Sequence, residues 1–322
     1  MTTAVRLLLA LALAVATFDR AQAQASYPDR PIRIVIGFGP GGLADITMRL
    51  VGQKLTELTG QQVVIENRPS AGGIVAASAV TSARPDGYTL FVLSSGIAIS
   101  RSLLKNMPFD PVNDFAPIST VAYFDLLLLS EAQSPLRTVA DVLAAARAKP
   151  GQFNVGTINP GSTQNLSAEL LKAATGVNMT IIPYRSTPEV LTALLRNDVQ
   201  IMMESYAALK APIDDGRVRP IASTGETRSP SLPAVPTLRE EGVSAEVVGW
   251  NALVAPAQTP KEIIAVLNRH VQTIVTQPDF RQRLLELGTE ARASTPEELG
   301  ARLSADIEKW AAVIRQAGIE PK

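Results

Sequence analysis

The sequence predicts an α/β fold of two lobes, each a sheet flanked by helices, with a ligand cleft between the lobes. Strand and helix patterns alternate along the chain, which is typical of parallel sheets with crossover helices. The alternation starts twice, at residues 32–36 and again at residues 154–158, each time as an expected strand followed by a glycine-containing turn and a helix. The length of 322 residues is sufficient for two domains of ordinary size.

Residues 1–25 have the pattern of a cleaved secretory signal peptide. Arg6 supplies a short positive region, and an apolar stretch at 7–18 follows it. Two overlapping segments, Ala21-Gln22-Ala23 and Ala23-Gln24-Ala25, then fit a small-x-small cleavage site. A short membrane anchor is the alternative, but the apolar stretch is shorter than a bilayer-spanning helix requires. We therefore expect a protein that is soluble outside the cytoplasm after cleavage.

The first sheet begins with the strand at 32–36 and the glycine-rich stretch at 38–45, Phe-Gly-Pro-Gly-Gly-Leu-Ala-Asp. A helix with apolar residues at helical spacing follows this turn. Such a turn leaves backbone N–H groups without partners and lies at the positive end of the helix dipole, so a carboxylate or phosphate fits there. The stretch matches neither the dinucleotide-binding fingerprint, which needs glycine at Ala44, nor a P-loop, because no Gly-Lys-Ser/Thr follows.

The remainder of the first lobe is predicted from the same alternation. A strand at 62–66, an alanine-rich helix that ends near Ala83 and a strand at 88–93 follow in order. Extended segments at 118–121 and 126–129 then carry the chain into the second lobe. We predict that lobe 1 comprises residues 26–125 and 249–322, and that lobe 2 comprises residues 126–248.

The second lobe repeats the architecture of the first. After a helix at 138–149, the expected elements are strands at 154–158, 179–183, 200–203 and 220–223, with helices at 163–175, 187–196 and 207–213. An apolar strand at 247–254 returns the chain to lobe 1, where helices at 261–276, 279–287 and 296–317 are expected to pack. The strand-to-helix turns of both lobes would lie at the carboxyl ends of their sheets and therefore face one cleft.

Composition excludes several classes of function. The chain has 30 basic and 30 acidic residues and 5% aromatic residues, so neither charge nor stacking surface favours nucleic acid. Cysteine is absent, which excludes disulfides and thiolate chemistry. The single histidine, His270, cannot form a multi-histidine metal site. We therefore predict no metal and no cofactor.

Several motifs in order then resemble the Bug proteins, the extracytoplasmic solute receptors of tripartite tricarboxylate transporters. The resemblance covers essentially the whole mature chain. It is carried by the segments 27–32 (Tyr-Pro-Asp-Arg-Pro-Ile), 38–46, 66–73 (Glu-Asn-Arg-Pro-Ser-Ala-Gly-Gly), 85–90 (Pro-Asp-Gly-Tyr-Thr-Leu), 109–111, 114–115, 183–185 (Pro-Tyr-Arg), 253–256, 259–260 and 296–298.

The resemblance implies a type II-like, two-lobed periplasmic binding protein that closes about a hinge on a small organic carboxylate. The ligand would be a di- or tricarboxylate, an acidic amino acid or an aromatic carboxylate, held largely by backbone amides and bridging waters. The partners implied are the membrane subunits of a tripartite tricarboxylate transporter, and the receptor would be a monomer in the periplasm.

Carried over by position, the resemblance and the strand-to-helix turns together nominate fifteen ligand-binding residues. On the first wall these are Phe38, Gly41, Gly42, Leu43, Asp45, Ser94 and Ser95. On the second wall they are Asn159, Ser162, Thr163, Asn165, Tyr184, Arg185, Ser186 and Glu204.

The chain departs from the family pattern at three places. The usual Pro-Phe-Pro-Pro at the start of the first loop is here Gly37-Phe38-Gly39-Pro40, which indicates a looser loop. Asn165 stands where the family often has histidine, and Glu204 stands where it often has aspartate. These departures leave the identity of the ligand open.

Several roles have two interpretations at this point. Asp45 is either a first-turn acid paired with Arg49 or a group that faces the cleft through water. Glu204 caps the next helix or selects the ligand, and Arg185 is a surface charge or a cleft residue. A receptor for a membrane sensor kinase is the alternative function. A periplasmic hydrolase using Ser94 or Ser95 is disfavoured because no base follows at a plausible position, so we predict that the protein is not an enzyme.

Overall fold

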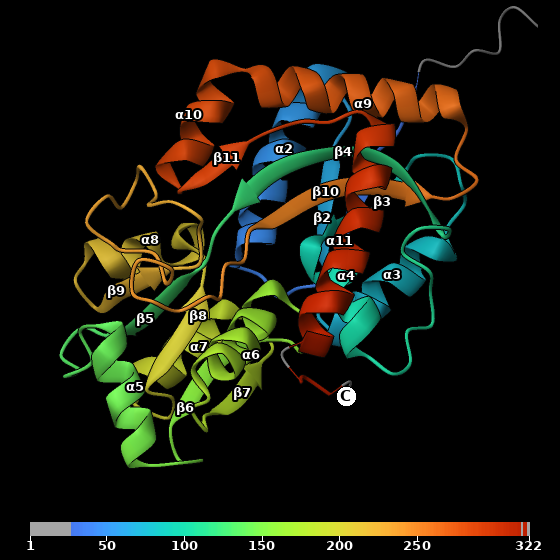
Figure 1. The fold of residues 1–322 in the computed structure, drawn as a ribbon. Helices are drawn as coiled ribbons and strands as arrows, with labels where there is room; N and C mark the ends of the chain where they lie inside the picture. Colours follow the sequence, from blue (N-terminus) through green and yellow to red (C-terminus); the bar gives the residue numbers. More distant parts are fainter. Residues whose placement is uncertain (1–26, 317, 321–322) are drawn as a thin grey trace, which may run out of the picture.

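The computed structural model describes residues 27–316 and 318–320, and it shows two mixed sheets flanked by helices (Figure 1). The first sheet has the strand order β11 (Thr289–Ala291), β4 (Phe115–Phe124), β10 (Gly249–Pro256), β3 (Thr89–Ser94), β1 (Ile32–Ile36) and β2 (Val63–Asn67). The second has the order β7 (Thr180–Tyr184), β6 (Asn154–Ile158), β8 (Ile201–Glu204), β5 (Leu127–Glu131) and β9 (Val218–Ser223). The predicted two-lobed α/β fold is confirmed.

Each sheet combines a parallel part with an antiparallel part. In the first, β1 pairs in parallel with β2 and β3, whereas β10 runs antiparallel to both β3 and β4. In the second, β6 pairs in parallel with β7 and β8, and β5 runs antiparallel to β8 and β9. Helices therefore connect the parallel strands of each sheet. The antiparallel strand beside them, β10 in the first sheet and β5 in the second, is the one that follows a crossing between the lobes.

The helices cover both sheets. Around the first sheet lie α2 (Leu43–Thr59), the short 3₁₀ turn η1 (Ala71–Gly73), α3 (Ile74–Thr81), α4 (Ser95–Leu103), α9 (Lys261–Thr276), α10 (Pro278–Glu286) and α11 (Pro296–Gln316). Around the second lie α5 (Val139–Ala148), α6 (Thr163–Thr175), α7 (Thr187–Leu195) and α8 (Tyr206–Asp214).

Local sequence explains where several helices begin and end. Thr138 forms a capping box with Asp141 at the start of α5, so two backbone N–H groups gain side-chain partners. Gly60 ends α2 in the left-handed conformation at φ 69°, which glycine adopts without steric cost. Two elements were not predicted: α4 begins where the strand at 88–93 was expected simply to end, and β11 follows α10.

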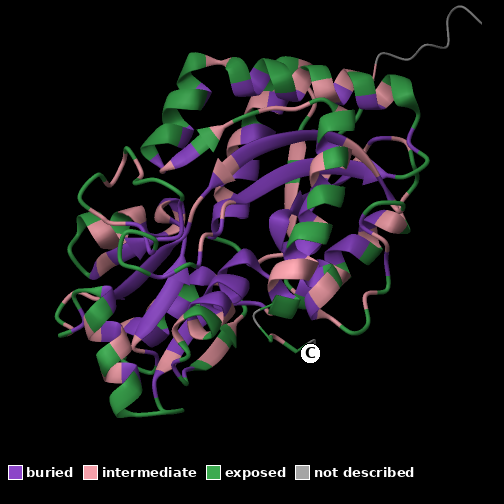
Figure 2. Cartoon of the chain, in the orientation of Figure 1, coloured by how far each residue is buried: buried purple, intermediate pink, exposed green. Residues whose placement is uncertain are grey.

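The strands are the most buried elements, as the purple ribbons of Figure 2 show. One core packs β1, β3 and β4 against α2 and α9, with α10 also contributing. Trp250 of β10 is fully buried, and its Nε1–H donates to Asp306 Oδ2 of α11 over 2.5 Å. This bond attaches the C-terminal helix to the middle of the first sheet.

Helices of the first sheet also reach the second lobe. Ile99 of α4 and Trp310 and Ile314 of α11 belong to the same apolar cluster as Leu166 and Leu171 of α6. The C-terminal helices therefore pack on lobe 1 as expected, but two of them also contact lobe 2: α11 through this cluster, and α10 through the Leu285 carbonyl oxygen, which accepts from the Ser231 hydroxyl over 2.9 Å.

The chain passes between the sheets at two places, through Asp125 and Leu126 after β4 and through Val248 before β10. With lobe 1 as residues 26–125 and 249–322 and lobe 2 as residues 126–248, each sheet lies in one lobe, and we keep this division as our proposal. No described helix combines the length and apolar character needed to span a membrane. The predicted signal peptide lies outside the described residues.

Candidate functional site

The glycine-rich loop between β1 and α2 forms the first wall of the cleft. Gly41 has a φ of 78°, and its N–H donates to Asp45 Oδ2 over 3.0 Å. Asn67 Nδ2 donates both to the carbonyl oxygen of Phe38 (3.2 Å) and to Asp45 Oδ1 (3.0 Å). The loop is thus folded around the Asp45 carboxylate, whose hydrogen bonds stabilise it on the side away from the cavity.

Asp45 is buried, and its carboxylate is fully engaged by the protein. Arg49 approaches Asp45 Oδ1 to 2.8 Å across one helical turn, as the i, i+4 spacing predicted. Burial alone would raise the pKa of Asp45, but hydrogen bonds from Arg49, the Gly41 N–H and Asn67 outweigh it and hold that pKa below its ordinary value. Its first-turn role is therefore present in the structure, and Asp45 does not line the cavity.

Two unpartnered side chains from neighbouring strands complete this wall. Ser94 ends β3 and Asn251 lies directly opposite it on β10 in the antiparallel register. Ser94 is 3% exposed and Asn251 2% exposed, yet Ser94 Oγ and Asn251 Nδ2 have no hydrogen-bond partner. Because buried polar groups are normally satisfied within the protein or by a bound molecule, this pair is a candidate contact for a ligand.

The second wall consists of the N-terminal turns of α6 and α7. Ser162 caps α6, with its hydroxyl accepting from the Asn165 N–H over 3.0 Å, and Thr163 and Gln164 follow it into the cavity. Ser186 and Thr187 begin α7, where no side chain caps the backbone. Helix α2 and helix α4 likewise begin without a side-chain cap. Four helix N-termini, from α2, α4, α6 and α7, therefore meet at one cavity, which favours an anion.

The cavity between the walls has a volume of about 30 Å³. Its lining includes no charged side chain and consists of Phe38, Gly39, Gly42, Leu43, Ala44, Ser94, Phe124, Ile158, Thr163, Gln164, Ser186, Thr187 and Asn251. A volume of this size holds roughly two water molecules. The structure is therefore a closed form of the cleft, and a larger guest enters only when the lobes separate.

Direct contacts between the lobes hold this closed form. The hydroxyl groups of Ser95 and Thr163 share a hydrogen bond of 3.0 Å, and Asn159 Nδ2 donates to the Ser70 carbonyl oxygen over 3.3 Å. Gly39 also approaches the other lobe closely: a Cβ placed there would lie 2.7 Å from the carbonyl oxygen of Arg185. Closure in this form depends on the absence of a side chain at position 39.

The predicted site residues fall into two groups. Six line the cavity: Phe38, Gly42, Leu43, Ser94, Thr163 and Ser186. The other nominated residues do not line the cavity, and their part in ligand binding stays a prediction. Gly41 and Asp45 support the first loop, Ser95 and Asn159 join the lobes, Ser162 caps α6, and Asn165 donates to Thr157 Oγ1 over 3.2 Å.

The remaining three lie on or under the second wall. Tyr184 packs at the edge of an apolar cluster of lobe 2. The Arg185 side chain is exposed, and its backbone N–H donates to Glu189 Oε2 over 3.1 Å. Glu204 ends β8 and is completely buried beneath α6 and α7. Burial raises the pKa of Glu204, an effect that hydrogen bonds from Thr187, Ser205 and Gln164 oppose.

Sequence reasoning did not nominate Asn251, Gln164 or Thr187. For Asn251 a signal existed, because it is the one strongly polar residue in the apolar run at 247–254. For Gln164 and Thr187 the signal was weaker, since each simply follows a nominated helix-start residue. Their importance depends on contacts with Glu204 that only the fold reveals.

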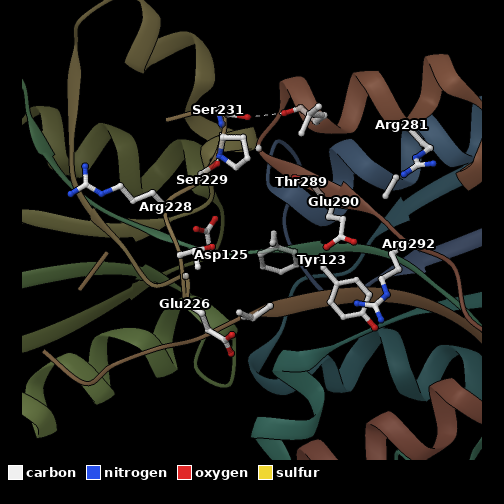
Figure 3. Close-up of a pocket in the computed structure, with 18 of the residues that line it drawn as sticks. Tyr123, Asp125, Glu226, Arg228, Ser229, Ser231, Arg281, Thr289, Glu290 and Arg292 are labelled. Atoms are coloured by element: carbon white, nitrogen blue, oxygen red, sulfur yellow. Dashed lines mark hydrogen bonds between the residues drawn. The ribbon is translucent and has the colours of Figure 1, made fainter. Parts of the chain in front are cut away.

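A wider groove of about 1130 Å³ lies beside the crossings and is lined from both lobes. Figure 3 shows Arg228 and Ser229 on one side, Arg281 and Arg292 on the other, and Asp125 between them. Burial raises the pKa of Asp125 to about 6.

The charged lining of this groove is largely engaged within the protein. Arg228 pairs with Glu240 over 2.9 Å, and the guanidinium groups of Arg292 and Arg302 both lie over the Tyr123 ring. The groove also lacks the convergence of helix N-termini that distinguishes the cleft, so the cleft is the better candidate for the ligand. Within the described part of the chain, no cluster of three or more potential ligating side chains could hold a metal ion.

Two mixed α/β lobes that close over an uncharged cavity, with helix N-termini on both walls, define a two-lobed periplasmic binding protein. The comparisons agree with this class. A sequence model described as the tripartite tricarboxylate transporter family receptor matches residues 47–319. The chain belongs to this receptor family, and within it to the Bug proteins.

Relatives cover the chain almost completely. Protein BugT of Bordetella pertussis is 31% identical over 322 residues, covering 98% of this chain and 99% of its own. A Rhodopseudomonas palustris structure with adipate is 34% identical, with a TM-score of 0.88 over 92% of this chain and 100% of that one. MatC of the same organism, with bound malate, is 30% identical, with a TM-score of 0.85 over 89% of this chain and 100% of that one.

Proposed function

We propose that this protein is a periplasmic solute receptor that captures a small organic carboxylate and delivers it to the membrane subunits of a tripartite tricarboxylate transporter. The observation that carries the proposal is the pair of unpartnered buried donors, Ser94 Oγ and Asn251 Nδ2, at the meeting point of four helix N-termini. The structures of relatives with adipate and with malate support the same ligand class.

The chemistry of the cleft favours recognition by dipoles. No arginine or lysine is among the residues that line the cavity, so a carboxylate would be held by backbone N–H groups of α2, α4, α6 and α7 together with hydroxyl and amide donors. Hydrogen bonds to a charged acceptor are stronger than neutral ones and strengthen further when water is excluded. Closure of the lobes would exclude water and thereby increase affinity.

Binding and release require movement about the two crossings. The closed cavity of about 30 Å³ is too small for a dicarboxylate, so the lobes separate to admit the ligand, and the cavity widens around it while the close approach of Gly39 to Arg185 is kept. We propose that the receptor is exported by the signal peptide at 1–25 and acts as a monomer.

Isothermal titration and thermal-shift measurements on residues 26–322 test the proposal. The panel comprises di- and tricarboxylates, acidic amino acids and aromatic carboxylates, with inorganic phosphate as the anion control. We expect saturable binding of at least one carboxylate, with a raised melting temperature and no response to phosphate. A folded protein that binds no member of the panel contradicts the proposal.

Transport and sensing use the same cleft and need a second assay. Vesicles that contain the transporter membrane subunits should accumulate the ligand only when the receptor is added. Ligand-dependent binding to a sensor kinase without any uptake would instead favour the sensor role.

We further propose that the cleft is not catalytic. The Ser95 hydroxyl is engaged with Thr163, and neither His270 nor any acidic residue lines the cavity to activate Ser94. Mass spectrometry after treatment with a serine-reactive fluorophosphonate should show no labelling of Ser94 or Ser95. Stoichiometric labelling at either residue would establish a hydrolase instead.

A further inference from the structure

Glu204 is a completely buried carboxylate under the second wall of the cleft. Its Oε1 accepts from Gln164 Nε2 (2.9 Å), the Ser205 N–H (2.7 Å) and the Ser205 hydroxyl (3.2 Å). Its Oε2 accepts from the Thr187 hydroxyl over 2.6 Å. Burial raises the pKa of Glu204, and the donors on both carboxylate oxygens oppose that rise because they stabilise the ionised side chain.

The charge of Glu204 has no cationic partner. Among the described residues, no lysine or arginine hydrogen-bonds to it or forms an ion pair with it. The carboxylate of the other wall, Asp45, is by contrast neutralised by Arg49. The helix N-termini of α6, α7 and α8 surround Glu204, so part of their positive potential is already used within the protein. The second wall is therefore less favourable to an anion than the first.

Thr187 connects the buried charge of Glu204 to the hydrogen-bonding character of the cavity. A hydroxyl group has one proton, and Thr187 commits it to Glu204. Thr187 Oγ1 also lies at the junction of the walls, 3.3 Å from where a Cβ at Gly42 would be. Thr187 is among the residues that line the cavity, so a ligand that reaches its hydroxyl oxygen meets an acceptor of a hydrogen bond and not a donor.

The opposite wall has the reverse polarity. Asn251 Nδ2 is a donor without a partner, and the unpartnered Ser94 hydroxyl can donate as well as accept; both residues line the cavity. A ligand that satisfies both walls needs an acceptor on one side and a donor on the other. A simple dicarboxylate provides acceptors on both sides and would place its second charge beside Thr187 and above Glu204.

We propose, on the basis of the proposed carboxylate-binding function, that the ligand is a hydroxy- or amino-carboxylate whose carboxylate faces Ser94 and Asn251 and whose hydroxyl or ammonium group donates to Thr187. Thr187 is then a specificity-determining residue. Glu204 is a positioning residue that fixes the direction of the Thr187 proton. An ammonium group would in addition compensate the buried charge of Glu204.

The variant Glu204→Gln should reverse the direction of the hydrogen bond between residue 204 and Thr187 at nearly constant side-chain volume. The amide oxygen would take the place of Oε1, where Gln164 and the Ser205 N–H donate, so the amide NH₂ would face Thr187. Thr187 would then accept from residue 204 and direct its own proton into the cavity. A general loss of structure could not produce such a reversal, so ligand preference distinguishes positioning from folding.

Titration calorimetry with ligands matched in chain length tests the inference: succinate, malate and aspartate form one set, and glutarate, 2-hydroxyglutarate and glutamate form another. In the wild type we expect a hydroxy or amino member of one set to bind at least roughly tenfold more tightly than its unsubstituted member. Thr187→Val should abolish that preference, and Glu204→Gln should abolish or invert it. Glu131→Gln, a carboxyl-to-amide change in β5 away from the cavity lining, serves as the matched control and should leave it unchanged.

The outcomes separate this inference from the function on which it rests. Equal or tighter binding of the unsubstituted acids by the wild type overturns the inference and leaves carboxylate binding intact. Failure of the folded wild type to bind any carboxylate overturns both. Should Glu204→Gln not fold, the comparison of wild type with Thr187→Val decides the question, because a preference that survives in Thr187→Val contradicts the assigned role.

Discussion

Replacing Gly39 by alanine tests whether the closed form described here is the form that holds the ligand. The added Cβ would lie 2.7 Å from the Arg185 carbonyl oxygen and 2.8 Å from Ser186 Cβ. Both distances are about 0.6–0.7 Å shorter than an ordinary contact of 3.4 Å. Overpacking of this kind costs roughly 1–3 kcal/mol, which corresponds to roughly 5- to 150-fold weaker binding if closure accompanies binding.

The same substitution should leave the separated lobes undisturbed. The three nearest atoms to the added Cβ all belong to Arg185 and Ser186 of lobe 2, so these close contacts are relieved when the lobes separate. Gly39 is also absent from the glycines with positive φ. Alanine at such a position typically stabilises the fold by roughly 0.4–1 kcal/mol through the unfolded chain. We therefore expect weaker ligand binding together with an unchanged or higher melting temperature of the free protein.

Titration calorimetry gives the affinity, thermal melts of the free protein give the stability, and small-angle scattering with and without ligand gives the degree of closure. Gly300→Ala is the matched control, because Gly300 lies in α11 and the nearest atom to its added Cβ, Pro117 Cγ, is 3.8 Å away. That control should bind normally. Wild-type affinity and wild-type compaction in Gly39→Ala would show that the bound form does not bring these loops into contact.

Three further changes have distinct expected results. Ser94→Ala should weaken carboxylate binding roughly tenfold, and Asn251→Asp should weaken it by roughly a hundredfold or more. Ser94→Ala should not lower the melting temperature, because the Ser94 hydroxyl has no partner in the free protein. Wild-type affinity of both variants in titration calorimetry would refute this prediction. Ser95→Ala and Thr163→Ala should show a coupling of about 0.5–1.5 kcal/mol in a double-mutant cycle of ligand binding, and additive effects would contradict the hydrogen bond between the lobes. Burial raises the pKa of Asp125 to about 6, so its contribution to stability is complete below about pH 4 and is lost as pH rises to about 6. In thermal melts, Asp125→Asn should therefore stabilise the protein by about 1–3 kcal/mol at pH 8 and by little at pH 4. An equal stability difference between variant and wild type at both pH values would contradict the raised pKa of Asp125.

The regular elements were predictable because their signals are local. The strand β1 coincides with an apolar run, β6 lies between two glycine-containing turns, and α5 starts at a Thr-Val-Ala-Asp capping pattern. Helix α4 was missed because Ser94-Ser95-Gly96 has the composition of a turn, although Ser94 acts as its N-cap residue. The three-residue strand β11 has no local signal, since it exists through its pairing with β4.

The site was predictable only in part, for a related reason. The glycine loop and the helix starts are contiguous in sequence, so the first wall could be located from spacing alone. The pairing of Ser94 with Asn251 depends on the register between β3 and β10, which are far apart in the chain. The direction of the Thr187 hydroxyl proton depends on Glu204, which ends the next element, β8. Sequence spacing identifies positions, whereas the direction of a hydroxyl proton depends on tertiary contacts.

The position of β10 between β3 and β4 has a consequence for how the receptor matures. A chain that emerges N-terminus first completes all five strands of the second sheet, β5 to β9, before β10 appears. Until then β3 and β4 have no common neighbour and Asn251 is absent from the first wall. Lobe 2 can thus assemble early, while the ligand site is incomplete until nearly the whole chain has been delivered.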